Sequence, residues 1–143
     1  TERGMKDQVT SIEQSKRLIE LGVPTEKASM VWEYWINQDF SKDPSEEVFY
    51  NLNTKANRQI DPSDRDVPAF TVADLLGLIK PIHIFENLWC PCIERTKGND
   101  GWMFEYGGMS EDEDFGYAQC HSIVDLLVSR IEWVVSNGYK LNL

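Results

Sequence analysis

The chain has 143 residues, a length that fits one domain, and 41% of them are hydrophobic, so a core can form without a disulfide or a metal. Its 24 acidic residues outnumber its 14 basic ones, and the formal net charge is −10. Duplex nucleic acid would be repelled, and no basic run overrides that repulsion, so we expect no nucleic-acid partner. The same charge favours a basic protein as a partner.

The number of cysteines and the length of the apolar runs indicate where in the cell the protein resides. Cys90, Cys92 and Cys120 are an odd number of thiols, and residues 1–8 read as a short polar tail with no signal peptide. Both observations predict a reducing, cytosolic environment. No stretch approaches the roughly 18 apolar residues of a membrane span, so we expect no membrane association.

The first predicted element is a helix over residues 11–21. Thr10 and Glu13 have the spacing of a capping box, in which the hydroxyl accepts from the Glu13 amide and the carboxylate reaches back. Gly22 ends this helix, and Thr25 caps a second, short helical turn.

Residues 28–36 fit two patterns. A helical stripe would contain Ala28, Val31, Trp32 and Trp35, and a strand face would contain Met30, Trp32, Tyr34 and Ile36. Because aromatic and β-branched residues are enriched here, we predict a strand over 31–36, with 47–52 as its antiparallel partner. Residues 37–45 form a polar loop in this reading, and 53–68 form a mobile surface loop.

The middle of the chain predicts a helix and then a hairpin. Thr71 and Asp74 make a second capping box, and the helix that they start extends to Ile79. Residues 82–85 form a short strand. Segments 89–97 and 102–107 form a hairpin with 98–101 as its loop, because apolar and polar residues alternate in the second segment.

The C-terminal segment 117–143 predicts one long amphipathic helix that Asn137-Gly138 closes. Its apolar stripe contains Cys120, Ile123, Val124, Leu127, Ile131, Val134 and Val135. The mixed order of helices and strands predicts a single α+β domain over 1–143. In it, an antiparallel sheet of three to five strands carries about three helices, packed mainly on one face.

Three parts of the chain resemble a known group of proteins. They are the N-terminal runs KDQV (6–9), IEQS (12–15) and LIELGVP (18–24), the run PAFTVADLL (68–76) and the run WVVSNGY (133–139). Together they resemble small acidic uncharacterised proteins of gut bacteria and their prophages or mobile elements. The resemblance implies a bacterial or phage context inside the cell, and it implies no activity. The loop 53–68 and the Cys90-Pro91-Cys92 stretch depart from the group's pattern.

Metal binding is a hypothesis that the spacing of the ligands disfavours. Cys90, Cys92, Cys120 and His121 are ligand types that zinc prefers, and His83 adds another imidazole. Structural zinc sites usually separate paired cysteines by two to four residues, whereas only Pro91 separates these two. We therefore predict no metal and no cofactor, and we interpret Cys120 as a core thiol on the last helix.

A pair of carboxylates suggests a hydrolase. If the hairpin loop is 98–101, Lys97 faces Trp102 and Glu94 faces Glu105. Two carboxylates that face each other across strands repel, and such a pair can perform acid–base chemistry. A small carboxylate-dependent hydrolase that uses Glu94 and Glu105 is therefore the alternative function.

The preferred function is a non-enzymatic acidic module that binds a protein, as an inhibitor, an adaptor or a homodimer. The acidic run Glu111, Asp112, Glu113 and Asp114 is the speculative partner-binding segment. Aromatic residues gather in the predicted strands, and aromatic surfaces favour interfaces. No nucleophile motif and no phosphate-binding loop points to a specific reaction.

Overall fold

The protein is described by a computed structural model over residues 7–36, 48–54, 65–84, 86–107 and 116–143. The helices are α2 (Ile12–Glu20), α3 (Val72–Leu78) and α4 (Ile123–Ser136), with a short 3₁₀ turn, η1 (Thr25–Lys27). The strands are β1 (Met30–Ile36), β2 (Val48–Thr54), β3 (Val67–Ala69), β4 (Ile82–Ile84), β5 (Asn87–Arg95), β6 (Trp102–Gly107) and β7 (Ala118–Cys120). Among these residues, no helix is both long and apolar enough to cross a membrane.

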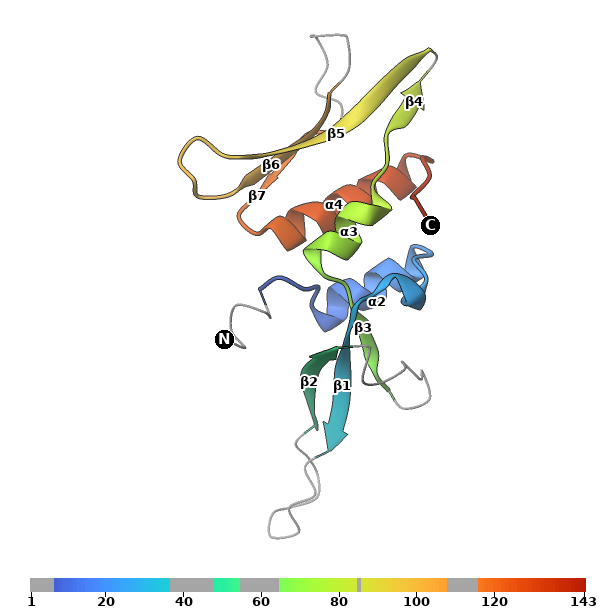
Figure 1. Ribbon diagram of the computed structural model, residues 1–143, viewed down its shortest axis with the longest axis vertical. Helices are drawn as coiled ribbons and strands as arrows, with labels where there is room; N and C mark the ends of the chain where they lie inside the picture. The colour runs from blue at the N-terminus through green and yellow to red at the C-terminus, as the bar shows by residue number, and fades with distance from the viewer. Residues whose placement is uncertain (1–6, 37–47, 55–64, 85, 108–115) are drawn as a thin grey trace.

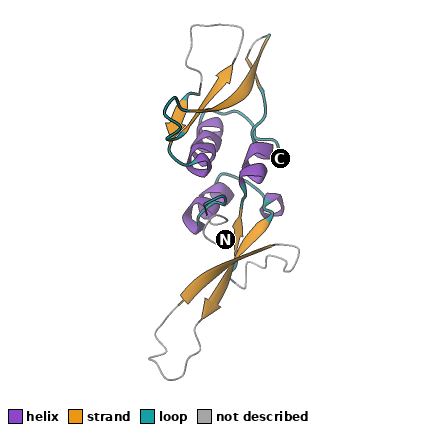
Figure 2. Ribbon diagram, turned by 60° about the vertical axis from the view of Figure 1, so that its left-hand side comes forward, coloured by secondary structure: helices purple, strands orange, loops and turns teal. Residues whose placement is uncertain are grey.

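The molecule contains both helices and antiparallel sheets, which confirms the predicted α+β class. The strands divide between a three-stranded sheet, in the order β2-β1-β3, and a four-stranded sheet, in the order β4-β5-β6-β7. Figure 1 shows an elongated molecule with the helices in its middle and one sheet at each end. Figure 2 shows that the described helices cover only one side of the four-stranded sheet.

The main core lies between the four-stranded sheet and the helices. Phe70, Leu75, Phe104, Leu127 and Ile131 are fully buried in it. A second, smaller core lies under the three-stranded sheet; its buried residues are Val9, Met30, Trp32, Val67 and Ala69. The molecule therefore has two halves, one built on each sheet and each with its own core.

The start of α2 differs by one residue from the prediction. Ser11 is the N-cap, and its partner in the capping box is Gln14. Thr10 is buried, and its hydroxyl bonds the hydroxyl of Ser15 and accepts from the Phe70 amide at 3.0 Å. The box prediction from Thr10 and Glu13 was therefore wrong, because tertiary contacts take the Thr10 hydroxyl and Ser11 has the same chemistry one residue later.

Hydrogen bonds from nearby residues satisfy the start of α3, and hydrogen bonds from a distant residue satisfy its end. Thr71 and Asp74 form the predicted capping box. At the other end, Asn142 donates from its backbone to Leu78 O at 2.8 Å and from its side chain to Gly77 O at 3.0 Å. The C-terminal segment thus satisfies carbonyl groups that the end of a helix leaves free.

The strand over 31–36 is confirmed as β1, and β2 is its partner, with Trp32 opposite Leu52. The predicted loop 53–68 was wrong at both ends, because β2 continues to Thr54 and β3 begins at Val67. Val67, Pro68 and Ala69 are buried. Residues 67–69 form a strand because they pair with β1 and pack against α2, although the sequence before them is polar and contains a proline. Residues 55–64 and the predicted loop 37–45 lie outside the described residues.

The C-terminal helix predicted from residue 117 was wrong at its start, whereas its predicted end at Asn137-Gly138 is confirmed. Residues 118–120 form β7 beside β6, Ser122 is the N-cap of α4, and the chain leaves the helix after Ser136. Gly138 has the left-handed φ of +78°, which agrees with its predicted role at the helix end. Cys120 lies opposite Trp102 on β7, so its place on a helical stripe was also wrong.

Candidate functional site: a cleft at two helix starts

A hollow among the described residues lies where the two halves of the molecule meet. It has a volume of about 670 Å³. Its lining comes from the N-terminal segment and α2 (Asp7, Val9, Ser11, Gln14), from β1 and β6 (Trp32, Trp102) and from the start of α4 (His121, Ser122, Ile123, Val124, Asp125). Volumes between about 300 and 1,000 Å³ are typical of ligand sites. Hereafter we call this hollow the cleft.

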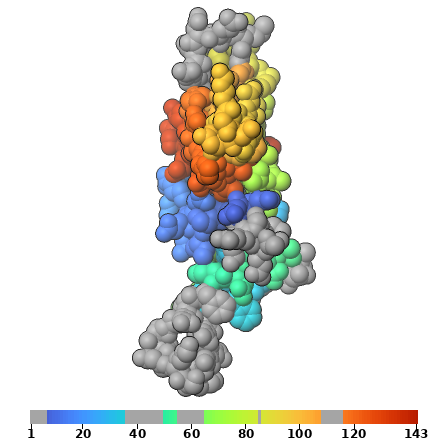
Figure 3. Space-filling model, turned by 90° about the vertical axis from the view of Figure 1, so that its left-hand side faces the viewer, coloured from blue at the N-terminus to red at the C-terminus, as the bar shows by residue number. Residues whose placement is uncertain are grey.

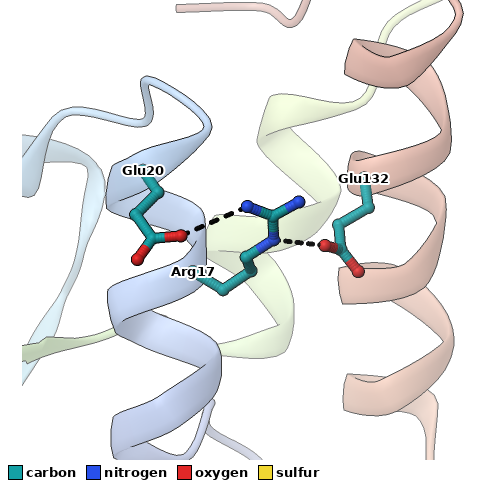
Figure 4. Close-up of polar contacts among 3 residues, drawn as sticks. All are labelled: Arg17, Glu20 and Glu132. Atoms are coloured by element: carbon teal, nitrogen blue, oxygen red, sulfur yellow. Dashed lines mark hydrogen bonds and ion pairs between the residues drawn. The ribbon is translucent and has the colours of Figure 1, made fainter.

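Two helices begin at the cleft and run in the same direction. Gln14 Nε2 donates to Asp125 Oδ1 at 2.7 Å, and further along both helices Arg17 Nε donates to Glu132 Oε1 at 2.5 Å. Figure 4 shows Arg17 between Glu20 of its own helix and Glu132 of α4. The hydrogen bond to Glu132 holds the pKa of Arg17 above its usual range. Both helix N-termini therefore lie on the same side of the molecule, the side that faces the viewer in Figure 3.

Two indole rings line the cleft from opposite halves of the molecule. Trp32 of β1 is buried, and its Nε1–H donates to the carbonyl of Thr10 at 2.9 Å. Trp102 of β6 is half-buried, and the guanidinium of Arg95 lies over its ring at 4.7 Å from the centroid. Both rings are held in place by these contacts, so the aromatic part of the lining is preformed.

His121 lies between the cleft and a second hollow of about 460 Å³, which Asp100, Gly101, Gln119 and Cys120 also line. His121 Nδ1 bonds the backbone carbonyl of Asp100. A carbonyl only accepts, so Nδ1 carries the proton and Nε2 is the acceptor of the neutral ring. The Thr96 hydroxyl, which bonds the Asp100 carboxyl at 2.5 Å, holds the pKa of that carboxyl below its usual range.

The lining of the cleft carries two acidic side chains, while Arg95 stacks on the Trp102 ring from outside the lining. Asp7 and Asp125 supply carboxylates, and no lysine or arginine of the described chain lines the cleft. Carboxylates beside indole faces attract a cation, since the ring faces carry negative electrostatic potential. The cleft is therefore suited to a positively charged or amide-rich group.

Comparison with known proteins gives no family for this fold. No family model, curated protein or solved structure matches the chain.

The predicted pairing of Glu94 with Glu105 was wrong. In the hairpin, Glu94 lies opposite Met103 and Glu105 lies opposite Cys92. The Thr96 amide bonds the Gly101 carbonyl at 3.1 Å, and Asn99 has a φ of +53°, so the turn is 97–100. This turn lies one residue earlier than predicted, which shifts the register by two residues.

The shifted register keeps both glutamates on the outer face of the sheet, where both are exposed. The depression that they line with Cys92, Met103 and Phe104 has no room for a water molecule. An acid–base pair needs space for a substrate or water between its carboxylates. The direct pairing of carboxylates on which the hydrolase hypothesis depends is therefore not formed.

The other predicted residues separate in space. The acidic run 111–114 lies outside the described residues. Cys90 and Cys92 are exposed on β5, while Cys120 is half-buried on β7. Within the described ranges, no group of three or more histidines, cysteines or acidic residues is arranged to hold a metal ion.

The aromatic residues of β1 divide between its two faces. Trp32 is buried on one face, whereas Trp35 on the other face is 46% exposed. Glu33, on the same face as Trp35, is buried and accepts from Asn53 at 2.6 Å and from the Trp35 indole at 3.2 Å. Trp35 is thus an exposed aromatic side chain of the three-stranded sheet that does not line the cleft.

Proposed function

We propose that this chain is a non-enzymatic, cytosolic module that binds a basic segment of a partner protein in the cleft. The supporting observation is the composition of the lining: two carboxylates and two indoles, with no lysine or arginine from the described residues. A lysine or arginine side chain would lay its apolar stem along the indoles and bring its charged head to Asp7 and Asp125. Such binding suits an inhibitor or an adaptor in a bacterial or phage setting.

The charge of the whole chain supports the same proposal. A net charge of −10 raises the encounter rate with a basic protein and lowers it with an acidic one. The acidic run 111–114 belongs to this proposal as a further attraction for a basic surface. Three free cysteines fit a reducing compartment, which is the reason for placing the module in the cytosol.

Selection from a peptide library tests the proposal with no need to identify the partner first. A random peptide library displayed on phage is selected against the full chain, and enriched peptides are synthesised and their affinity measured by fluorescence anisotropy. We expect a central lysine or arginine in the enriched peptides and weaker binding at high than at low NaCl concentration, because salt screens exposed charges. Enrichment of acidic or purely apolar peptides would contradict the proposal.

Two charge-reversal variants locate the binding site. Asp7→Lys places a cation in the lining, and we expect about tenfold weaker peptide binding, which corresponds to one lost charge contact. Glu26→Lys makes the same change of net charge on the exposed η1 turn, outside the lining, and should leave most of the affinity. Equal losses in both variants would show that net charge alone attracts the peptide and would overturn the cleft as its site.

A further inference from the structure

Strand β5 is longer than the strand that covers one of its edges. β4 pairs with β5 only from Asn87 to Trp89, whereas β5 continues to Arg95, so β4 lies beside one end of β5 (Figure 1). From Cys90 onwards, β6 is the only described strand that pairs with β5. Among the described strands, β5 therefore has an open edge over residues 91–95, which we call the β5 edge.

The hydrogen-bond register shows which backbone groups point to this edge. Just beyond β5, the Thr96 amide donates to the Gly101 carbonyl at 3.1 Å, so this pair is hydrogen-bonded. Hydrogen-bonded pairs alternate along an antiparallel ladder, so the even-numbered residues of β5 bond β6. Pro91, Ile93 and Arg95 consequently direct their backbone groups away from β6, toward the β5 edge.

The other sheet has a similar edge, and there a side chain caps it. β3 pairs with β1 only from Met30 to Trp32, and beyond β3 the Asp66 carboxylate accepts from the Tyr34 amide at 3.1 Å. Within the described ranges, no loop or side chain caps the backbone of β5 in this way. The β5 edge thus keeps a row of donors and acceptors, which is the chemistry that another extended backbone matches.

The side chains along the β5 edge define the segment that it suits. Ile93 is half-buried against the main core, whereas Glu94 is exposed on the opposite face of the strand. In an added antiparallel strand, one residue would lie beside Glu94 and the next beside Ile93. Pro91 has a carbonyl but no N–H, which limits the length of the pairing. The edge therefore suits a short segment in which a lysine or arginine directly precedes a β-branched residue.

A second copy of the chain fits this edge poorly. If two β5 strands paired around Ile93, residue 97 of one copy would lie opposite Trp89 of the other, where β4 already pairs. If they paired around Glu94, the two Glu94 carboxylates would lie directly opposite each other, which destabilises a sheet. A different protein is the better occupant, and the net charge of −10 favours a basic one.

We propose that the β5 edge binds an extended basic segment of a partner protein as an additional antiparallel strand. Ile93 and Arg95 each donate an N–H and accept at a carbonyl, and Pro91 accepts only. Main-chain hydrogen bonds give such complexes their affinity, and alternate side chains give them specificity. None of residues 91–95 lines the cleft, so this surface is separate from the cleft and does not depend on the function proposed for it.

Titration of the isotope-labelled full chain with the peptide acetyl-TKVTVG-amide, followed in amide NMR spectra, tests the proposal. In antiparallel pairing, the lysine of this peptide lies opposite Glu94 and its first valine lies opposite Ile93. We expect saturable binding with the largest shifts at the amides of Ile93 and Arg95. A peptide that is N-methylated at the first valine cannot donate to the Ile93 carbonyl and should bind about tenfold more weakly.

Three variants of the chain test the side-chain and backbone contributions. Glu94→Gln should weaken binding about threefold, because one cross-strand charge is lost. Glu105→Gln makes the same change on the exposed face of β6, one strand from the edge, and should leave binding nearly unchanged. Pro91→Thr supplies the missing N–H and should strengthen binding several-fold.

Four outcomes would overturn the proposal. They are an absence of saturable binding, equal binding of the N-methylated peptide, and shifts at the cleft residues Trp32 and Trp102 in place of β5. The fourth is a dimer in analytical ultracentrifugation that Pro91→Thr strengthens and the peptide dissociates, since it would assign the β5 edge to a second copy of the chain.

Discussion

Gln14 Nε2 donates to Asp125 Oδ1 at 2.7 Å, and this bond joins two residues that hold the same position in different helices. Each is the third residue after its N-cap, Ser11 for α2 and Ser122 for α4. The two helix starts are therefore level with each other at the edge of the cleft. Asp125 lies in the first turn of α4, beside the first turn of α2, at the place where a cation is proposed to bind.

Gly116 precedes β7 in a conformation that only glycine adopts easily. Its φ is +65°, and an added Cβ would lie 2.9 Å from Tyr106 Cδ2 and 3.3 Å from two ring atoms of Trp133. We expect Gly116→Ala to lower the free energy of unfolding by about 2–4 kcal/mol, because left-handed strain and overpacking add. Urea denaturation, followed by tryptophan fluorescence, measures the change.

At Gly77 in α3 we expect the same substitution to have the opposite effect on the free energy of unfolding. A Cβ there meets no heavy atom within 4 Å, and the residue lies inside a helix. Gly77→Ala should raise the free energy of unfolding by about 0.5–1 kcal/mol, because alanine restricts the unfolded chain and favours helix. Destabilisation by both substitutions would show that the environment of α3 differs from the one described.

Burial raises the pKa of the Tyr106 hydroxyl to about 12, from an ordinary value of 10.0. Above pH 10 the unfolded chain loses this proton and the folded chain keeps it, so the free energy of unfolding falls as pH rises. We expect a loss of about 1 kcal/mol between pH 10 and 11, measured by urea denaturation at each pH. The Tyr106→Phe variant should not show this loss. If its free energy of unfolding falls as steeply with pH as that of the unchanged chain, other groups cause the pH dependence.

Asp74 connects α3 to the segment before β1. Its carboxylate accepts from Ser29 N at 2.8 Å, from Ser29 Oγ at 2.6 Å and from Thr71 N at 2.9 Å. Asp74→Ala should lower the free energy of unfolding by about 2 kcal/mol, and Asp74→Asn by less, because the amide keeps one acceptor oxygen. Glu26→Ala removes an exposed carboxylate from η1 and is the control; a loss equal to that of Asp74→Ala would contradict the role of these bonds.

Arg130 of α4 holds the segment that leads into β7. Its Nη1 donates to Gly116 O at 3.0 Å and to Tyr117 O at 3.3 Å, and burial lowers the pKa of its guanidinium from the ordinary value. Arg130→Met conserves most of the packing but removes both bonds, so we expect a loss of about 1–3 kcal/mol in thermal or urea unfolding. Lys16→Met, on the exposed face of α2, should change stability far less.

Several elements were predictable because their signals lie within a few residues. The capping box of Thr71 and Asp74 marked the start of α3, and the glycine after α4 marked the end of that helix. The aromatic and β-branched run at 31–36 marked β1. Each of these signals works through bonds or rotamer preferences of neighbouring residues, which the chain order already contains.

The errors occurred where distant segments decide the outcome. Residues 118–120 have a helix-compatible pattern, yet they pair with β6, and Gly101, directly before β6, leaves room for the Cys120 carbonyl, which a Cβ there would approach to 2.8 Å. In the hairpin, the bond from Thr96 to Asp100 and the left-handed Asn99 set the turn and moved Glu105 opposite Cys92. Trp32, Trp102 and His121 were visible in the sequence, but nothing in their spacing predicted that they line one cleft.

The sequence by itself determined the α+β class, most of the helices and strands and the net charge of −10. Only the tertiary structure decided the division into two sheets, the hairpin register, the cleft at the starts of α2 and α4 and the β5 edge beyond the end of β4. The physical reason is the range of the forces: caps, turns and propensities act over about four residues, whereas registers and clefts follow from which buried surfaces pack together across the whole chain.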